Sequence, residues 1–398
     1  MLLDADPARA FMPYPAAAVR HAETGPLSGL TFAVKDLFDV AGYPTSSGSP
    51  HMLALSGIKT RTAPSVQKLL DAGARFVGKT ITDELAFSLS GKNAHFGTPI
   101  NGGAPDRIPG GSSSGSASAV SNKMCDFALG TDTGGSVRGP ANHCGLFGLR
   151  PTHGRVSLEG CHDLSPSFDT CGFFARDAAT FTRVGEVLLG EDTAPLPQKP
   201  RVLLAKDTFG LLQGPVREAL QPALRQIEAV VGRTQEVNAA QDGFTTLYWA
   251  MRYIQSREAW ATDGAMIERF QPPLGPGVKD RFEFSKAVTD QQVTESLGIR
   301  SVFRERFGAL FGQDAILVLP SMPDIAPLLS ESEESLNDYR NNALNLLCLS
   351  VLSGQPQVSI PLASRAGAPL GLSIMGPAGS DMSLVSLAAR IADAPVGA

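Results

Sequence analysis

Two hydrophobic patterns alternate along the first part of the chain. Residues 29–34 form a short, largely apolar run, which predicts a buried strand. Within residues 63–72 the apolar side chains recur three or four positions apart, which predicts a helix with Thr62 as its cap and Gly73 at its end. Residues 75–78 return to an apolar run and predict the next strand. Strands that alternate with helices are typical of an α/β fold.

The same two patterns continue further along in different proportions. Residues 127–130 predict another short strand, and residues 206–304 have mainly helical spacing. Two more apolar runs, residues 314–320 and 370–376, predict buried strands toward the C-terminus. Because strands occur in both halves, we expect residues 1–398 to form one α/β domain. Its mixed, mostly parallel central sheet would be covered by helices on both faces.

Composition narrows the classes of function. Hydrophobic residues make up 43% and charged residues 18%, which is typical of a globular protein with a sizeable core. A net charge of −5 offers no basic surface for phosphate backbones, so we expect no nucleic-acid partner. The five cysteines are odd in number and irregularly spaced, which indicates a reducing compartment rather than a disulfide framework.

Targeting signals are not apparent in the sequence. The chain does not open on a basic segment followed by an apolar run, as a signal peptide does. The most apolar later stretch, residues 343–352, is much shorter than the roughly 20 residues of a membrane span. We therefore expect no membrane association and a cytoplasmic location.

Two glycine–serine clusters carry the candidate chemistry, residues 110–116 (GGSSSGS) and residues 130–138 (GTDTGGSVR). A serine hydrolase needs an exposed hydroxyl, a base, and N–H donors aimed at the developing oxyanion. Glycines allow successive N–H groups to converge on one point, which makes Ser136 the candidate nucleophile. Either cluster alone is typical of a surface loop. Here both occur together with Lys35 and Asp36 at the end of a predicted strand.

These segments resemble the signature of the amidase signature family. Ser112 and Ser136 lie 24 positions apart, as the bridging and nucleophilic serines of that family do. Residues 33–36 (AVKD) are similar to the family's lysine motif, and residues 145–157 are similar to the continuation of its signature. The resemblance is dense over residues 25–190 and sparse toward the C-terminus.

Within one domain, the resemblance implies three functional parts. Residues 25–190 would form the catalytic half, and residues 200–350 the helices around the substrate pocket. Residues 354–398 would supply the C-terminal strands and a helix.

The family mechanism, carried over by position, implies a serine amide hydrolase. Lys35 would act as a neutral general base. Ser112, which the family holds with a cis peptide bond, would relay a proton to it from Ser136. Ser136 would then attack the amide carbonyl and form an acyl-enzyme that water resolves. For Lys35 to be neutral, the neighbouring Asp36 must point to the other face of the strand.

Further residues are expected to support this triad. Oxyanion and substrate contacts are expected from Thr133, Gly134, Gly135, Ser113 and the N–H group of Ser136. Asp132 and Arg138 are expected to brace the turn. The resemblance implies neither a metal nor a cofactor, and it leaves a homodimer open.

A resemblance to one subgroup indicates the substrate. Residues 83–87 and 93–99 are similar to the plant indole-3-acetamide hydrolases, and residues 105–107 and 167–170 add to that likeness. We therefore expect a small primary amide with an aryl acyl group, such as indole-3-acetamide, to be cleaved to a carboxylate and ammonia.

Interpretations outside this family are weaker. Residues 73–80 match G-x-x-x-x-G-K-[ST], but their first glycine follows a predicted helix, whereas a phosphate loop follows a strand. A Ser-His-Asp hydrolase would need a histidine near Ser136, and no spacing indicates one. The candidates would be His95, His143, His153 and His162. A zinc site would have to use Cys144, Cys161, His162 and Cys171, which lack the paired spacing of zinc ligands.

Two alternatives remain within the family. One is a glutaminase subunit of a tRNA-linked amidotransferase, which requires partner chains. The other is a non-catalytic binding relative, which would be expected to lose a serine or the lysine. Lys35, Ser112 and Ser136 are all present here.

Overall fold

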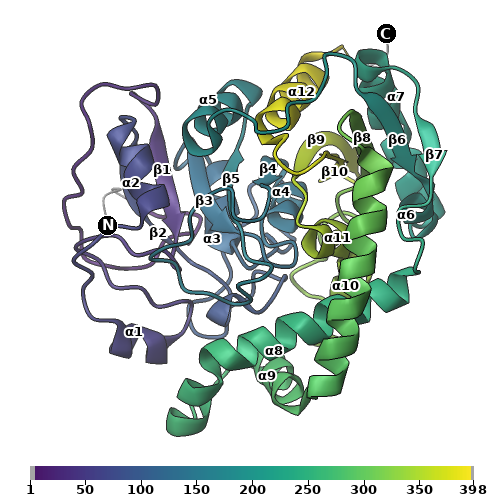
Figure 1. Ribbon diagram of the computed structural model, residues 1–398. Helices are drawn as coiled ribbons and strands as arrows, with labels where there is room; N and C mark the ends of the chain where they lie inside the picture. Colours follow the sequence, from purple (N-terminus) through teal and green to yellow (C-terminus); the bar gives the residue numbers. More distant parts are fainter. Residues whose placement is uncertain (1–4, 396–398) are drawn as a thin grey trace.

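One ten-stranded sheet runs through the molecule in the order β2-β1-β3-β5-β4-β9-β10-β8-β6-β7 (Figure 1). The computed structural model describes residues 5–395. The strands are β1 (Thr31–Lys35), β2 (Arg75–Thr80), β3 (Phe127–Thr131), β4 (Phe147–Arg150), β5 (Cys171–Ala175), β6 (Arg201–Ala205), β7 (Gln235–Val237), β8 (Ala315–Pro320), β9 (Gln357–Arg365) and β10 (Ala368–Met375). Because both halves of the chain share this sheet, the expected α/β architecture is confirmed.

Parallel pairing is confined to the two edges of the described sheet. The strands β2-β1-β3 and β8-β6-β7 pair in parallel. The five pairings between them are antiparallel. The expectation of a mixed sheet is confirmed, but the expectation that parallel pairing dominates is wrong. One reason lies between β9 and β10, where Ala366 and Gly367 form a two-residue turn with positive φ, and so short a connection joins only antiparallel strands.

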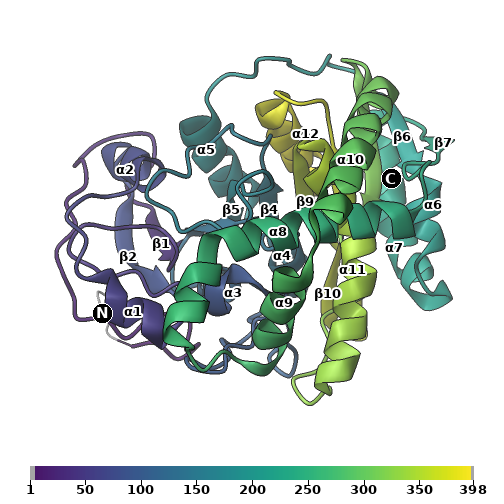
Figure 2. The same ribbon diagram turned by 60° about the horizontal axis from the view of Figure 1, so that its bottom comes forward.

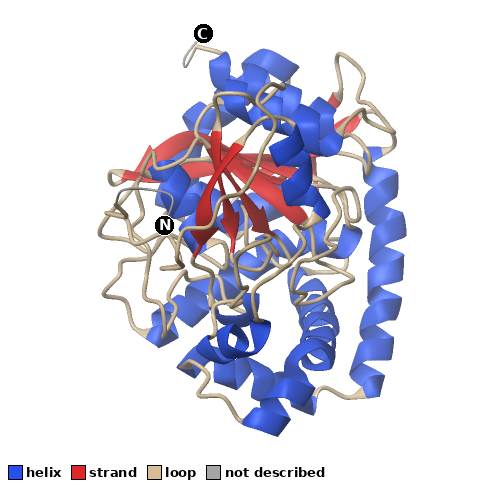
Figure 3. Cartoon of the chain, turned by 90° about the vertical axis from the view of Figure 1, so that its left-hand side faces the viewer, coloured by secondary structure: helices blue, strands red, loops and turns tan. Residues whose placement is uncertain are grey.

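Helices cover both faces of the sheet (Figure 3). The helices of the described chain are α1 (Pro50–Ser56), α2 (Pro64–Asp71), α3 (Ser114–Ser121), α4 (Arg138–Cys144), α5 (Ala178–Leu189), α6 (Lys206–Gly210), α7 (Gly214–Val231), α8 (Phe244–Phe270), α9 (Pro276–Ala287), α10 (Asp290–Phe311), α11 (Glu333–Ser353) and α12 (Asp381–Asp393), with a short 3-10 turn at Glu84–Ala86. Strand β8 shows why two covers are needed. Ile316 and Val318 join the core beneath α7 and α12, whereas Leu317 and Leu319 join the core beneath α10 and α11.

A group of long helices lies over one side of the molecule. Helix α8 packs against α9, α10 and α11, and Figure 2 shows these four helices side by side. The expected helical region over residues 206–304 is confirmed, except for the short strand β7. That strand has the sequence Gln-Glu-Val and lies largely exposed at the sheet edge, so it carries no apolar run to reveal it.

Local expectations around α2 are met in part. Gly73 follows the helix with φ +92, as expected for a helix end. The expected cap is wrong, because Ala63 occupies the N-cap position and the Thr62 hydroxyl instead accepts the N–H of Ala41 at 3.1 Å. Residues 75–80 form β2, so the G-x-x-x-x-G-K-[ST] segment contains a strand and no phosphate loop.

Candidate active site

Lys35 ends β1, and its side chain is completely buried. Its Nζ donates to the hydroxyl of Ser112 at 2.7 Å and to that of Thr131 at 2.8 Å. Thr131 ends β3, which pairs in parallel with β1, so both strands deliver these side chains to the same edge of the sheet. Among the described residues no carboxylate pairs with Lys35. Burial lowers the pKa of Lys35 to about 8, although the charge of Asp83 acts in the opposite direction.

Asp36, the next residue, is paired elsewhere. Its carboxylate lies 2.6 Å from Nζ of Lys79 in β2, and both side chains are fully buried. The hydroxyl of Tyr14 donates to Asp36 at 2.7 Å, and the N–H and hydroxyl of Ser46 donate to the same oxygen. The expectation that Asp36 leaves Lys35 unpaired is therefore confirmed.

Ser112 lies in the loop that precedes α3. The peptide bond between Gly111 and Ser112 is cis, as the family resemblance implies. The Ser112 carbonyl accepts the N–H of Asp83 at 3.0 Å and the hydroxyl of Thr82 at 2.9 Å. The N–H of Gly111 donates to the carbonyl of Leu89 at 2.9 Å. These bonds tie the serine backbone to the segment that follows β2.

The second glycine–serine cluster forms a tight turn between β3 and α4. Ser136 lies in this turn, almost completely buried, and its hydroxyl has no hydrogen-bond partner within the described residues. Gly135 has φ +122, which glycine tolerates, and a Cβ there would collide with Leu347 of α11. A Cβ on Gly134 would lie 3.4 Å from Nε2 of Gln255 in α8. The two glycines thus let α8 and α11 approach the backbone beside Ser136.

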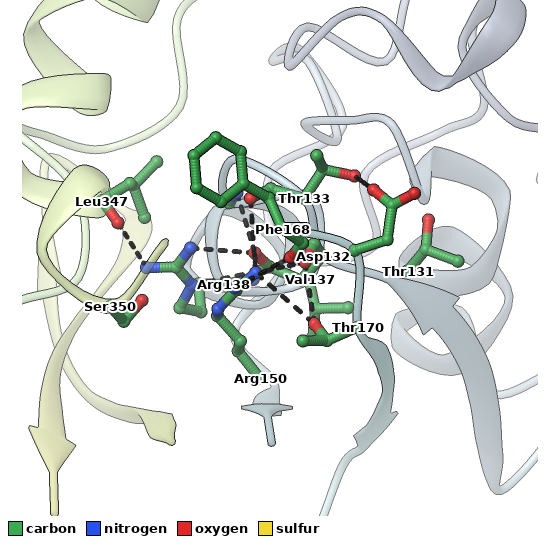
Figure 4. Close-up of polar contacts among 12 residues, drawn as sticks. Thr131, Asp132, Thr133, Val137, Arg138, Arg150, Phe168, Thr170, Leu347 and Ser350 are labelled. Carbon is green, nitrogen blue, oxygen red and sulfur yellow. Dashed lines mark hydrogen bonds and ion pairs between the residues drawn. The ribbon is translucent and has the colours of Figure 1, made fainter. Parts of the chain in front are cut away.

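Asp132 organises this turn (Figure 4). One of its oxygens accepts the N–H of Gly135 at 2.9 Å, and the other accepts those of Val137 and Arg138 at 3.1 and 3.2 Å. The Arg138 guanidinium donates to both oxygens at 3.0 and 2.8 Å, and Arg150 adds a bond at 3.0 Å. Burial alone would raise the pKa of Asp132, but the charges of Arg138 and Arg150 hold it well below its usual range.

The two arginines connect the turn to the rest of the fold. Arg138 donates to the carbonyl of Leu347 at 3.1 Å and to Oε1 of Gln357 at 2.7 Å, which joins the turn to α11 and β9. Arg150 donates to the carbonyl of Phe168 at 2.9 Å. Figure 4 shows the side chains of Arg138 and Arg150 converging on Asp132. The backbone next to Ser136 is therefore held by fully buried charges that are paired with one another.

The expected set of oxyanion donors needs one correction. The N–H of Gly135 is occupied by Asp132, so it does not point at a substrate oxygen. Glycine is needed at this position for its backbone conformation. The N–H groups of Thr133, Gly134 and Ser136 have no partner among the described residues. They are the donors that this turn leaves available.

Ser113 also differs from expectation. The Ser113 hydroxyl donates to the carbonyl of Thr131 at 3.2 Å and accepts its N–H at 3.3 Å, so it anchors β3 and does not face substrate.

Three buried residues that support the site were not predicted from the sequence. One of them, Asp169, accepts the hydroxyl of Thr133 at 2.5 Å, which fixes the start of the turn. Thr131, Arg150 and Asp169 were each inside a motif already noted. Only their contacts distinguish them from their neighbours in the sequence.

No histidine reaches Ser136 within the described residues. The ring partners are Glu84 for His95, Tyr339 for His143, Pro166 for His153 and Asp263 for His162. The Ser-His-Asp alternative therefore has no geometric basis. Within residues 5–395 no three His, Cys, Asp or Glu side chains gather as metal ligands would. No helix in that range is both long and apolar enough to cross a bilayer.

Comparison with known proteins indicates the family. The family model described as Amidase matches residues 8–385. Amidase 1 of Arabidopsis thaliana is 40% identical, over 92% of this chain and 93% of that protein. The chloroplastic outer envelope protein 64 of the same plant is 36% identical, over 90% of this chain and 65% of its own length. A glutamyl-tRNA(Gln) amidotransferase subunit of Methanothermobacter thermautotrophicus is 32% identical, over 93% of this chain and 86% of that protein.

The fold comparison leads to the same family. A solved structure described as the crystal structure of an amidase superposes with a TM-score of 0.82 and 31% sequence identity. The match covers 92% of this chain and 85% of that one. With a family model that spans nearly the whole chain and relatives of this similarity, the chain belongs to the amidase signature family of amide hydrolases.

Proposed function

We propose that this protein cleaves small primary amides to a carboxylate and ammonia through Lys35, Ser112 and Ser136. The observation that carries the proposal is the 2.7 Å contact from Lys35 Nζ to Ser112 Oγ in a site where no described carboxylate pairs with the lysine. A buried amine with a pKa of about 8 is substantially neutral near pH 8 and able to accept a proton.

The reaction begins with two coupled proton transfers. Ser112 gives its hydroxyl proton to neutral Lys35 and takes the hydroxyl proton of Ser136, whose oxygen attacks the amide carbonyl. The carbonyl oxygen becomes an oxyanion, which the N–H groups of Thr133, Gly134 and Ser136 stabilise. The relay then returns a proton to the departing nitrogen, and ammonia leaves. Water, deprotonated by the same relay, hydrolyses the acyl-enzyme.

Asp132 and Arg138 act on this chemistry indirectly. They hold the turn so that the available N–H groups keep one geometry while charge develops. Arg150, which also pairs with Asp132, adds to this support.

Indole-3-acetamide is the first substrate to test, because of the subgroup resemblance and the similarity to a plant Amidase 1. Glutamine belongs in the same panel, since one relative is part of a glutamyl-tRNA(Gln) amidotransferase. We place the reaction in the cytoplasm, a location supported by the five free cysteines. The mechanism needs no homodimer, since every residue it uses belongs to one chain.

The test is ammonia release from a panel of primary amides by the wild type and by Ser136→Ala and Lys35→Ala. Both variants are expected to lose activity. Ser386→Ala and Lys199→Ala, at exposed positions away from the triad, are the matched controls and should retain it. Full activity in Ser136→Ala would show that the nucleophile is misassigned. If the wild type releases no ammonia from any amide of the panel, the result would favour a non-catalytic binding relative.

A further inference from the structure

Three arginines lie beside the active site without a carboxylate partner. Arg252 belongs to α8, Arg281 to α9 and Arg340 to α11. Arg252 and Arg340 are only 8% and 9% exposed. Within the described chain none of the three forms an ion pair, and the Nε atom of each is buried without a hydrogen-bond partner. Such an arrangement is unusual, because buried charges are normally paired.

The three guanidinium groups lie close enough to act on one another. Burial and the charge of Arg252 lower the pKa of Arg281 to about 10. Burial, with the charges of Arg252 and Arg281, lowers the pKa of Arg340 well below its usual value. The guanidinium of Arg252 also lies 5.8 and 5.5 Å from the ring centroids of Tyr248 and Phe284, which hold it in place but neutralise no charge. An anion among the three would remove the repulsion.

Nearby carboxylates do not supply that anion. Glu333 lines the same cavity as Arg281 but pairs with Lys92 at 3.6 Å. Asp83 is buried, and burial raises its pKa, although the charges of Lys35 and Arg281 act in the opposite direction. Asp83, Asp280 and Glu333 all act on the charge of Arg281, but within the described chain none of them forms an ion pair with the three arginines.

Helix periodicity places these arginines beside the nucleophile turn. Gln255 follows Arg252 by three residues on α8, and Leu344 follows Arg340 by four on α11, so each pair shares a helix face. A Cβ on Gly134 would lie 3.4 Å from Gln255 and 3.6 Å from Leu344. Both arginines are thus about one helical turn, roughly 5–6 Å along each axis, from residues that pack on this turn.

A small cavity lies beside two of the arginines and the segment that holds the Ser112 backbone. It measures about 30 Å³ and is lined by Arg281, Arg340 and Leu89, among others. The carbonyl of Leu89 accepts the N–H of Gly111, the residue before Ser112. A space of this size is large enough for a water molecule or for one carboxylate oxygen. The remainder of a bound substrate would have to lie outside it.

We propose that Arg281 and Arg340, with Arg252 behind them, bind a carboxylate on the acyl part of the substrate. The preferred substrate is then a monoamide of a dicarboxylic acid, and a neutral amide is a poorer one. Guanidinium groups bind carboxylates with paired, charge-assisted hydrogen bonds, which fixes the far end of the acyl chain. This inference rests on the proposed amide hydrolysis, and within it favours such acidic amides over the neutral indole-3-acetamide.

The kinetic test uses two amides that differ at one end. Glutaramate and pentanamide share an acyl chain, which ends in a carboxylate in the first and a methyl group in the second. The wild type should prefer glutaramate. Arg281→Gln and Arg340→Gln should lower kcat/KM for glutaramate roughly 10- to 100-fold and leave pentanamide within about threefold. Arg340→Lys should lose less, and Arg225→Gln, exposed on α7, should change neither substrate.

Equal losses on both amides, or a wild-type preference for pentanamide, would overturn the assignment. If pentanamide is hydrolysed and the arginine variants show no selective loss, the carboxylate site fails while the proposed hydrolysis stands.

A binding measurement separates this site from the catalytic proposal. Calorimetry with Ser136→Ala enzyme should detect glutarate, and the added Arg340→Gln change should weaken that binding roughly tenfold or more. Inorganic phosphate at equal ionic strength should bind more weakly. Absence of glutarate binding, or equal binding of phosphate, would overturn the carboxylate assignment. Glutarate binding in an enzyme that hydrolyses neither amide would preserve the site and defeat the proposed function.

Discussion

Lys35 and Lys79 lie on neighbouring parallel strands, one register step apart, and both are buried. Lys79 pairs with Asp36 at 2.6 Å and also donates to the Pro44 carbonyl at 2.7 Å. Lys35 meets hydroxyl groups only. Two buried lysines on neighbouring strands thus have different roles. A carboxylate at contact distance makes Lys79 a structural cation, and the absence of one makes Lys35 a candidate base.

The arginines repeat this contrast on a larger scale. Arg138 and Arg150 surround the carboxylate of Asp132 and fix a turn. Arg252, Arg281 and Arg340 form no ion pair among the described residues, and their Nε atoms have no hydrogen-bond partner. Buried charges in ion pairs hold the backbone of this protein in place, whereas we expect a substrate or a proton where a buried charge has no ion-pair partner. The following variants test that distinction.

Lys35→Met is expected to have the largest effect. It removes the proposed base, so kcat/KM toward the best amide should fall about 10²- to 10⁴-fold. It also removes an unpaired buried charge, so the free energy of unfolding in urea should not decrease. Initial rates and urea denaturation curves measure both quantities. A retained rate, or a large loss of stability, would contradict the distinction between the two lysines.

Lys79→Met is expected to do the reverse. It leaves Asp36 buried without its cation, which should lower the free energy of unfolding by about 3–5 kcal/mol. The rate per folded molecule should change little, because neither side chain contacts the triad. The double variant Asp36→Asn/Lys79→Met should be more stable than Lys79→Met alone. Simple addition of the two single losses would show that the pair is not coupled.

The pH dependence of the rate tests the state of Lys35. The folded pKa is lowered from 10.5 to about 8, so the neutral base accumulates as the pH rises through about 8. Below that value kcat/KM should fall about tenfold per pH unit. The profile for a neutral amide between pH 6 and 10 gives the midpoint. A flat profile over this range would exclude a lysine base with this pKa.

Thr131→Val is expected to have the smallest effect. The Thr131 hydroxyl accepts a bond from Lys35 Nζ at 2.8 Å and helps to stabilise the charged form. Its loss should lower the pKa of Lys35, so the midpoint of the rate profile should move down by about half a pH unit. A shift to higher pH would mean that the hydroxyl favours the neutral amine instead.

Prediction succeeded where the signal is local. Strands β1, β2, β3, β8 and β10 are visible in the sequence as short apolar runs, and the serine spacing identified the family. Prediction failed where the outcome depends on a distant segment. The antiparallel centre of the sheet follows from the strand order. The N–H of Gly135 is occupied because the Asp132 side chain points toward it and accepts its hydrogen bond. Ser113 was misjudged because its hydroxyl meets β3 instead of a substrate.

Periodicity and motif spacing are properties of the chain alone, so they were enough to predict the fold class, the family and the residues from which a triad could be built. Which buried charges form ion pairs depends on how distant segments pack. Asp36 follows Lys35 in sequence and yet pairs with Lys79, because successive side chains point to opposite faces of a strand. Arg252, Arg281 and Arg340 are scattered over three helices, and their meeting depends on how those helices pack.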